Sequence, residues 1–236
     1  MRSSIVFKAI TFVLPLFIIS GFLYLRYFKY EFYDFLISED SIFEYFQAIA
    51  YFSTGVIYML IAFKCTGETV RLQRILFITA GLGALIIAME EISWGQRLFG
   101  INTPEWFQKH NIQNELSIHN LKPVQKIVHL LYALTGFVLS FGWISLGENF
   151  PYQKLPPGLI SFVRMLKPKW FLMTYFLPLF LFYTSLLLTG SPGNYFTYND
   201  QEVTELLLSL GLFWYSFLIL GSLKRRVCDD QALFHG

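Results

Sequence analysis

Glutamate and histidine residues near the middle of the chain have types and spacing that could perform acid–base chemistry. Glu90 and Glu91 are adjacent, and His119 follows Glu115 by four residues. A positioned carboxylate can serve as a general base. On a helix, Asn111, Glu115 and His119 would share one face, and the Glu115 carboxylate could orient the imidazole and fix its tautomer. We therefore expect Glu90 or Glu91 to act as the base and His119 as its acid–base partner, oriented by Glu115.

His129 extends this candidate catalytic set, because it follows His119 and lies within an apolar stretch. As a single histidine it also fits a buried, hydrogen-bonded side chain. Glu91, His119 and His129 together would supply the three protein ligands that a catalytic divalent metal requires. No HxxxH, HExxH or CxxC spacing accompanies them, so the sequence leaves open whether the cofactor is a divalent metal or none.

Two cations and an amide could bind an anionic group of a substrate. Arg97 and Lys126 lie on either side of His119 in the sequence, and Asn120 follows it directly. Guanidinium and ammonium groups bind carboxylates and phosphates through charge-assisted hydrogen bonds. The structural alternative is an ion pair between Arg97 or Lys126 and the two adjacent glutamates, which would compensate charges placed near a membrane boundary.

The composition shows what kind of element must position these residues. Of the 236 residues, 55% are hydrophobic and 14% are charged, whereas a soluble globular protein carries about 25% charged residues. This composition excludes a soluble enzyme, a disordered chain and a coiled coil, and the net charge of +2 is too small for a nucleic-acid-binding surface. We therefore expect an integral membrane protein that lies in the lipid bilayer.

Six apolar windows are long enough to cross a bilayer core of about 30 Å, which requires about 20 residues per helix. They are continuously apolar and not alternating, which excludes a membrane β-barrel. The sequence predicts an all-α, polytopic transmembrane helix bundle that forms a single integral membrane domain over residues 1–236. The predicted spans cover residues 9–25, 42–63, 75–92, 124–146, 170–189 and 202–223.

A segment of about residues 93–123 separates the third and fourth predicted spans. Thr103, Pro104 and Glu105 are typical of a helix start, with Thr as the N-cap, Pro at the first helical position and an acidic residue in the first turn. The segment is therefore predicted to be structured and to contain a short helix.

The distribution of Lys and Arg predicts the orientation, because cytoplasmic loops carry the excess of these residues. With a cytoplasmic N-terminus, 12 of the 18 Lys and Arg residues fall on the inner side. Both termini are then cytoplasmic, and residues 93–123 lie on the outer face of a membrane that we expect to be the bacterial inner membrane.

Polar residues recur at helical spacing in the outer halves of other spans. Ionisable groups in membrane helices usually face the bundle interior and pair with one another. We therefore expect these polar stripes to converge with Glu90 and Glu91 near the outer leaflet. The stripes are Glu44, Gln47, Tyr51 and Tyr58 in the second span, Lys126, His129, Tyr132 and Gly136 in the fourth, and Glu202, Glu205, Ser209 and Ser216 in the sixth.

The run from Glu90 to Arg97, EEISWGQR, is followed by Asn114-Glu115 and His119-Asn120. This pattern resembles a motif of uncharacterised multi-pass membrane proteins of bacteria. The resemblance covers about residues 88–121. It implies the location of a site in this segment and adds no activity.

Two functions of different classes fit these features. The first is an enzyme that acts at the outer leaflet on a lipid or lipid-linked substrate through an acid–base or metal site. The second is a non-catalytic membrane component, either a transporter or an accessory subunit, whose outer segment docks a protein partner that the sequence does not identify. The inner halves of the predicted spans are nearly all apolar, which disfavours a continuous transport path through one chain.

Overall fold

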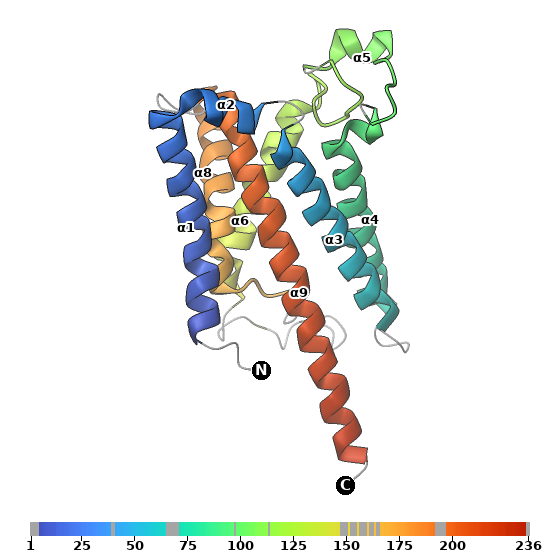
Figure 1. Cartoon of the computed structure of the whole chain (residues 1–236). Helices are drawn as coiled ribbons and strands as arrows, with labels where there is room; N and C mark the ends of the chain where they lie inside the picture. Colours follow the sequence, from blue (N-terminus) through green and yellow to red (C-terminus); the bar gives the residue numbers. More distant parts are fainter. Residues whose placement is uncertain are drawn as a thin grey trace.

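The structure, a computed structural model, is built from helices (Figure 1). Among the residues it describes there is no β-strand, and the one isolated bridge joins Asn111 and Leu121. The all-α prediction is therefore confirmed. The described residues are 5–38, 41–64, 71–96, 98–112, 114–146, 166–191 and 197–234, together with 151, 155, 160 and 163, and from 223 onward only the helical backbone is described.

Within these ranges, six helices are long and apolar enough to span a membrane, which confirms the predicted multi-pass bundle. Each overlaps one predicted window, and α1 begins four residues before its window because the flanking residues continue the same helix. The spans are α1 (Ile5–Phe28), α3 (Ile42–Lys64), α4 (Arg71–Glu91), α6 (Gln125–Ser145), the pair η4 (Trp170–Leu172) and α8 (Met173–Thr189), and the first 22 residues of α9 (Gln201–Phe234).

Shorter helical elements lie between the spans. The unexpected one is α2 (Tyr30–Ile37), an eight-residue helix whose charged residues Glu31 and Asp34 interrupt any apolar run. Its Tyr33 and Ile37 side chains are buried, so packing and not length stabilises it. The other short elements are η2 (Ser93–Gly95), α5 (Glu105–His110) and η5 (Tyr198–Asp200).

The spans pack in a continuous order across the bundle (Figure 1). α3 packs along α4 on one side and along α9 on the other, α9 contacts α8, and α8 packs along α6, while α1 lies against α8. α4 therefore packs mainly on α3, and α6 mainly on α8, so these two helices do not pack extensively on each other. The helix before the 93–123 segment, α4, and the helix after it, α6, thus pack on different neighbours.

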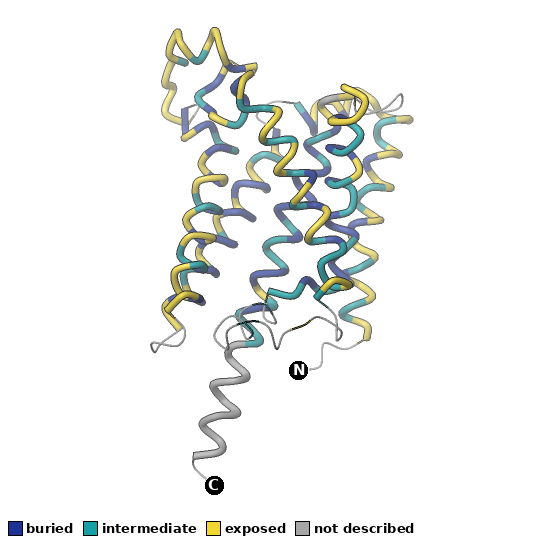
Figure 2. Tube along the Cα trace, turned by 180° about the vertical axis from the view of Figure 1, so that it is seen from behind, coloured by how far each residue is buried: buried dark blue, intermediate teal, exposed yellow. Residues whose placement is uncertain are grey.

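Exposed residues lie on the outward faces of the spans and buried residues on their inward faces (Figure 2), and many of the exposed side chains are large and apolar. Phe17 on α1 and Leu188 on α8, for example, are 72% and 80% exposed. Apolar side chains directed away from the bundle are expected where the surrounding solvent is lipid.

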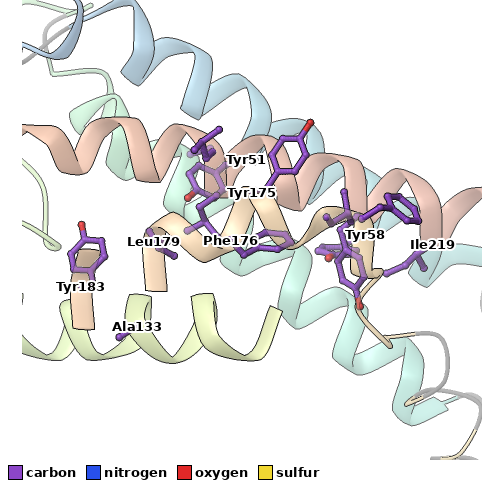
Figure 3. Close-up of a cluster of buried hydrophobic side chains, with 14 of the residues drawn as sticks. Tyr51, Tyr58, Ala133, Tyr175, Phe176, Leu179, Tyr183 and Ile219 are labelled. Carbon is purple, nitrogen blue, oxygen red and sulfur yellow. The ribbon is translucent and has the colours of Figure 1, made fainter. Parts of the chain in front are cut away.

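Aromatic side chains fill the interior between α3, α8 and α9 (Figure 3). Tyr51, Tyr175 and Tyr183 are almost completely buried, and Phe176 and Leu179 pack within the same cluster. Aromatic rings bury a large apolar area each and fix the relative positions of the helices that carry them.

α6 and α8 approach closely at Gly136. A Cβ atom at this position would lie 2.6 Å from the backbone nitrogen of Phe180, and small residues commonly permit such close approach in membrane proteins. The approach brings two α6 rings to Tyr183 of α8, because the ring centroids of His129 and Tyr132 lie 5.2 Å and 4.8 Å from its centroid.

Candidate functional site

The candidate site lies at the end of the bundle where α4 ends and α6 begins (Figure 1). Residues 93–123 fold back across this end, and we call them the capping segment. They are described except for positions 97 and 113. α5 lies on the side of the capping segment that faces away from the spans (Figure 1). The two halves of the capping segment place several of the predicted site residues near the end of α4 and the start of α6.

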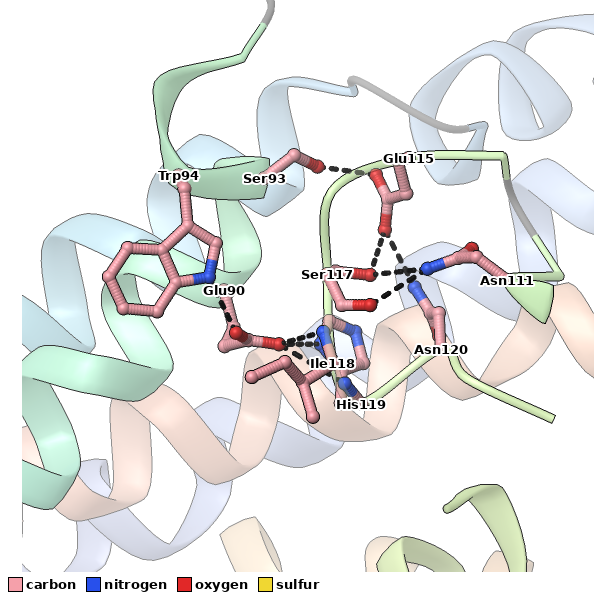
Figure 4. A network of polar contacts seen from close by, with 9 residues as sticks. All are labelled: Glu90, Ser93, Trp94, Asn111, Glu115, Ser117, Ile118, His119 and Asn120. Atoms are coloured by element: carbon pink, nitrogen blue, oxygen red, sulfur yellow. Dashed lines mark hydrogen bonds and ion pairs between the residues drawn. The ribbon is translucent and has the colours of Figure 1, made fainter. Parts of the chain in front are cut away.

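A left-handed turn directly after α4 begins the capping segment. Ser93, Trp94 and Gly95 have φ values of +47°, +55° and +74°, in a region that non-glycine residues seldom adopt. The turn is held in place by its surroundings, because its Ser93 hydroxyl and Trp94 indole both donate hydrogen bonds to glutamates (Figure 4). Local backbone strain of this kind is often found at functional sites.

The Glu90 carboxylate fastens the capping segment to α4 (Figure 4). One oxygen accepts a hydrogen bond from Trp94 Nε1 at 2.6 Å. The other accepts from the backbone amides of Ile118 and His119 at 2.6 Å and 3.1 Å, and from His119 Nδ1 at 3.2 Å. Hydrogen bonds to an ionised, buried acceptor are stronger than those between neutral groups. Glu90 therefore orients His119.

Residues 111–121 form an irregular hairpin. A shared face of positions 111, 115 and 119 would instead require a helix. Asn111 and Leu121 form an antiparallel bridge, and Asn111 Nδ2 donates to the backbone oxygen of Ser117 at 2.8 Å. Short polar side chains compete with helix formation through such local bonds. The predicted helical face shared by positions 111, 115 and 119 does not form.

Glu115 consequently has a role other than the predicted one. Its carboxylate holds the hairpin and the left-handed turn together, and it does not orient the His119 imidazole, which is hydrogen-bonded to Glu90. Glu115 is 8% exposed, so its bonds are protected from water. They come from Ser93 Oγ at 2.5 Å, Ser117 Oγ at 2.7 Å and Asn120 Nδ2 at 2.8 Å.

The short helix α5 begins at Glu105, within one residue of the predicted start. Thr103 does not cap it through its side chain. The Thr103 hydroxyl instead donates to the backbone oxygen of Asn114 at 2.8 Å and accepts from Gln96 Nε2 at 2.5 Å. These bonds join the first and second halves of the capping segment.

A small cavity of about 30 Å³ lies beneath the capping segment, and we call it the acidic cavity. It has room for one or two water molecules. The predicted convergence of polar residues from the second, fourth and sixth spans with Glu90 and Glu91 is confirmed by its lining. The lining residues are Glu44 of α3, Glu90 and Glu91 of α4, Glu115, His119 and Asn120 of the capping segment, Gln125, Val128, His129 and Tyr132 of α6, Tyr183 of α8, and Gln201, Glu202 and Glu205 of α9.

The lining of the acidic cavity is strongly unbalanced in charge. Six glutamate carboxyl groups and two imidazoles face it, and no Lys or Arg is among the lining residues that the structure describes. Like charges repel strongly where water is largely excluded. Bound protons or a cation must therefore offset the excess of carboxyl groups, and this arrangement is suited to holding and transferring protons.

The carboxyl groups differ in their hydrogen bonding. Gln47 Nε2 donates to Glu202 at 3.1 Å, and the Tyr183 hydroxyl donates to Glu205. Glu91 also lines the acidic cavity, but its carboxyl group forms no hydrogen bond with any residue in the described ranges. It is therefore open to a molecule that enters the cavity.

His119 is the ionisable group of the capping segment that the site perturbs most clearly. Burial by itself lowers the pKa of the imidazole, but the hydrogen bond to Glu90 and the negative charges of Glu205, Glu90 and Glu115 outweigh it. The pKa of His119 is therefore raised above its ordinary value of 6.5. A protonated imidazole is favoured next to the Glu90 carboxylate.

The predicted anion-binding residues are not brought together. Asn120 lines the acidic cavity and donates to Glu115, whereas Lys126 is exposed on α6 and does not line it. Arg97 lies outside the described residues. The ion-pair partner of Glu90 is His119 and not Lys126.

The three predicted metal ligands, Glu91, His119 and His129, all line the acidic cavity. Within the described ranges, however, no group of three His, Cys, Asp or Glu side chains is placed to bind one metal ion. The side-chain geometry therefore gives no support to the divalent-metal alternative.

Several lining residues were missed from the sequence. Tyr183 lies in an apolar helix that contains no Asp, Glu, Lys, Arg or His, so no periodic charged signal marks it. Gln125 and Gln201 are the first residues of α6 and α9, where the exact end of a helix decides which side chain faces the cavity. The one available signal was the position of these two glutamines at the boundary of an apolar window.

Comparisons with protein-family models, with curated proteins and with solved structures each find no match to this chain. The likeness noted over residues 88–121 thus remains an observation on the sequence. The fold and the lining of the acidic cavity define a multi-pass helical bundle with a buried cluster of ionisable groups at one end.

Proposed function

We propose that this protein is a membrane-embedded enzyme that uses acid–base chemistry on a lipid or lipid-linked substrate at the capped end of the bundle. The observation that carries the proposal is the gathering of six carboxyl groups and two imidazoles around one water-sized cavity. Charged groups placed in membrane helices are costly, and their retention usually reflects a function.

The geometry supports different roles for the two adjacent glutamates. Glu91 faces the acidic cavity without a hydrogen-bond partner among the described residues, so it is suited to remove a proton from a water molecule held there. Glu90 is fully engaged with Trp94 and His119, so it acts as a positioning residue. A general base must reach the proton that it removes, and Glu91 is the carboxyl group with that freedom.

The surroundings of His119 support its role as the general acid. Its raised pKa favours the protonated imidazole near neutral pH, and its Nδ1 is held by Glu90. The remaining ring nitrogen, Nε2, is then the one that can donate a proton to a leaving group. An acid and a base with separate environments in one cavity form the pair that hydrolysis at neutral pH requires.

The bilayer is the favoured source of the substrate. The acidic cavity has room for a water molecule but not for a head group, so the bulk of a substrate must lie outside it. α4 and α6 do not pack extensively on each other beside the cavity, and Ile86 of α4, one helical turn before Glu90, is 52% exposed. A lipid could therefore approach between these two helices.

The test is product formation from defined lipids. Purified protein would be incubated with vesicles of phosphatidylglycerol, phosphatidylethanolamine and a polyprenyl-phosphate-linked sugar, and products followed by mass spectrometry. Glu91→Gln and His119→Gln should each lower the rate by at least about 100-fold. Glu105→Gln and His110→Gln are the matched controls, because both residues are exposed, and they should keep the wild-type rate.

Unchanged turnover by Glu91→Gln in a monodisperse, helical preparation would contradict its role as base. An equal loss of rate in Glu105→Gln and His110→Gln would show that substitutions in the capping segment act only through its structure. Absence of product from all of these lipids would contradict the proposed substrate class.

A docking role is the second candidate function, and one observation favours it. Phe99, Leu98 and Trp106 of the capping segment are 77%, 62% and 53% exposed, and exposed aromatic and apolar side chains are typical of interaction surfaces. Co-purification of a stoichiometric partner that is lost on Phe99→Ser, with no turnover of lipid, would favour this function over the enzyme.

A further inference from the structure

A second cavity lies between α1, α8 and α9, and we call it the apolar cavity. Its volume is about 490 Å³, in the range of small-molecule sites, which are mostly apolar with a few polar groups. Leu16 and Ile19 of α1, Leu177 of α8 and Leu207 of α9 are among the residues that line it. It is separate from the acidic cavity, with which it shares no lining residue.

The apolar cavity opens to the surroundings of the bundle, because Leu16, Leu23 and Leu181 in its lining are 45%, 38% and 57% exposed. A space of this size is larger than the voids that protein interiors retain, so an occupant is expected. Apart from Tyr33 of α2 and Asp200 of η5, the lining residues belong to three membrane-spanning helices, so the medium around them is hydrocarbon. A lipid chain is therefore the occupant that the surroundings supply.

The ionisable groups that line the apolar cavity lie at one end of it. Arg26, Tyr33 and Asp200 line it there, at the same end of the bundle as the capping segment, because α1 ends near Arg26 and α9 begins directly after Asp200. Asp200 forms an ion pair with Arg26 and accepts a hydrogen bond from the Tyr33 hydroxyl. Its carboxylate also accepts from the Thr197 amide at 2.6 Å.

This cluster is suited to the head group of an anionic lipid. A guanidinium has five N–H donors, so it can serve a carboxylate and a phosphate together. Arg26 carries the positive charge among the described residues that line the apolar cavity. Asp200 and the Tyr33 ring, whose centroid lies 5.7 Å from the guanidinium carbon, hold Arg26 at the mouth.

The length of the apolar cavity fits one leaflet. Leu16 and Arg26 line its two ends on α1, and ten residues of helix rise about 15 Å. This is about half of the 30 Å hydrocarbon core of a bilayer. A chain that enters with its head group at Arg26 would therefore reach the middle of the membrane.

We propose that the apolar cavity binds one hydrocarbon chain of a membrane phospholipid, whose phosphate lies against Arg26. The chain packs on the faces of α8 and α9 opposite to those that carry Tyr183 and Glu205 into the acidic cavity. The proposal does not depend on the enzymatic function, because its observations come from a different set of residues.

The experiment is native mass spectrometry of the detergent-purified full chain with added phosphatidylglycerol, and with palmitate in a separate arm. The wild type should bind one phosphatidylglycerol per chain. Leu177→Trp, which fills the apolar cavity, should weaken binding by at least about tenfold. Leu188→Trp on the same helix is the matched control, because Leu188 is 80% exposed and does not line the cavity.

Arg26→Gln tests the head-group contact and should also weaken phosphatidylglycerol binding by about tenfold, the effect of one lost charge-assisted contact. Arg26→Gln also breaks the ion pair with Asp200. Phosphatidylglycerol binding is therefore measured in the double variant Arg26→Gln, Asp200→Asn as well, in which both charges of the pair are absent. Equal binding by the wild type and Leu177→Trp would overturn the proposal. Tight binding of palmitate without binding of phosphatidylglycerol would also overturn it, because the site would then select a free fatty acid.

Discussion

His119 is the residue whose protonation the surrounding structure controls most directly. Its imidazole is hydrogen-bonded to Glu90, and its backbone amide donates to the same carboxylate. A single carboxylate thus fixes both the position of the backbone and the orientation of the ring. At this scale the predicted partner of the His119 imidazole, Glu115, is wrong, because the ring is hydrogen-bonded to Glu90, which is 29 residues away in the sequence.

The raised pKa of His119 predicts a dependence of stability on pH. The protonated ring contributes stability that is fully present below the unfolded pKa of about 6.5 and is lost as pH rises through the raised folded value. Thermal unfolding measured from about pH 5 to pH 9 should show wild-type Tm falling across this window. His119→Gln should flatten that part of the profile.

The exposed His110 offers the control for this measurement. His110→Gln should leave the fall in Tm unchanged. A wild-type profile identical to that of His119→Gln would show that the Glu90 pair contributes nothing to stability.

At the scale of the elements, the capping segment depends on its left-handed turn. Gly95 and Gly100 both have positive φ, +74° and +62°. A Cβ at Gly95 would lie 2.9 Å from the Phe99 ring, whereas a Cβ at Gly100 would meet nothing within 4 Å. Alanine substitutions at Gly95 and Gly100 therefore separate the free-energy cost of the backbone conformation from that of a steric clash.

Gly95→Ala should destabilise the capping segment more than Gly100→Ala does. Both lose about 1–2 kcal/mol because an alanine is disfavoured in this region, and Gly95→Ala adds an overpacking cost of about 1 kcal/mol or more. Amide hydrogen exchange of residues 93–123 would measure both changes. Equal exchange rates in the two variants would show that the Phe99 ring moves aside without cost.

Elements of the fold could be predicted to different degrees. The six spans follow from apolar length alone, and α5 follows from Pro104 and Glu105. α2 could not be predicted, because its helix is stabilised by burial of Tyr33 and Ile37 against other helices, which local sequence does not show. The hairpin over residues 111–121 could not be predicted, because the spacing of Asn111, Glu115 and His119 is compatible with both a helix and a hairpin.

At the scale of the whole molecule, the acidic cavity exists because helices far apart in sequence are brought to one end of the bundle. Periodic polar residues on three spans predicted this convergence correctly, since charges in a membrane must face the interior. Tyr183 could not be predicted, because its place beside Glu205 is set by the packing of α8 on α9. The close approach of α6 and α8 is equally a property of the assembled bundle.

Gly136→Ala tests the dependence of the site on that approach. The new Cβ would lie 2.6 Å from the Phe180 backbone nitrogen, so α6 must move away from α8 and carry His129 with it. We expect a loss of about 1–3 kcal/mol in stability and a lower rate in the lipid assay. Thermal unfolding in detergent would measure the first effect.

Gly21→Ala on α1 is the matched control, because a Cβ there meets nothing within 4 Å. It should leave Tm unchanged or raise it slightly, since alanine is the better helix former. A Gly136→Ala variant as stable as Gly21→Ala would show that α6 and α8 can separate freely.

The hydrogen bond from the Trp94 indole to Glu90 gives the protein an intrinsic optical probe. Indole fluorescence responds to nearby charge, and Trp94 shares its acceptor with His119. In a variant that keeps Trp94 and replaces the other four of the five tryptophans, the emitted light therefore reports the ionisation of the candidate acid, with no label attached to the protein.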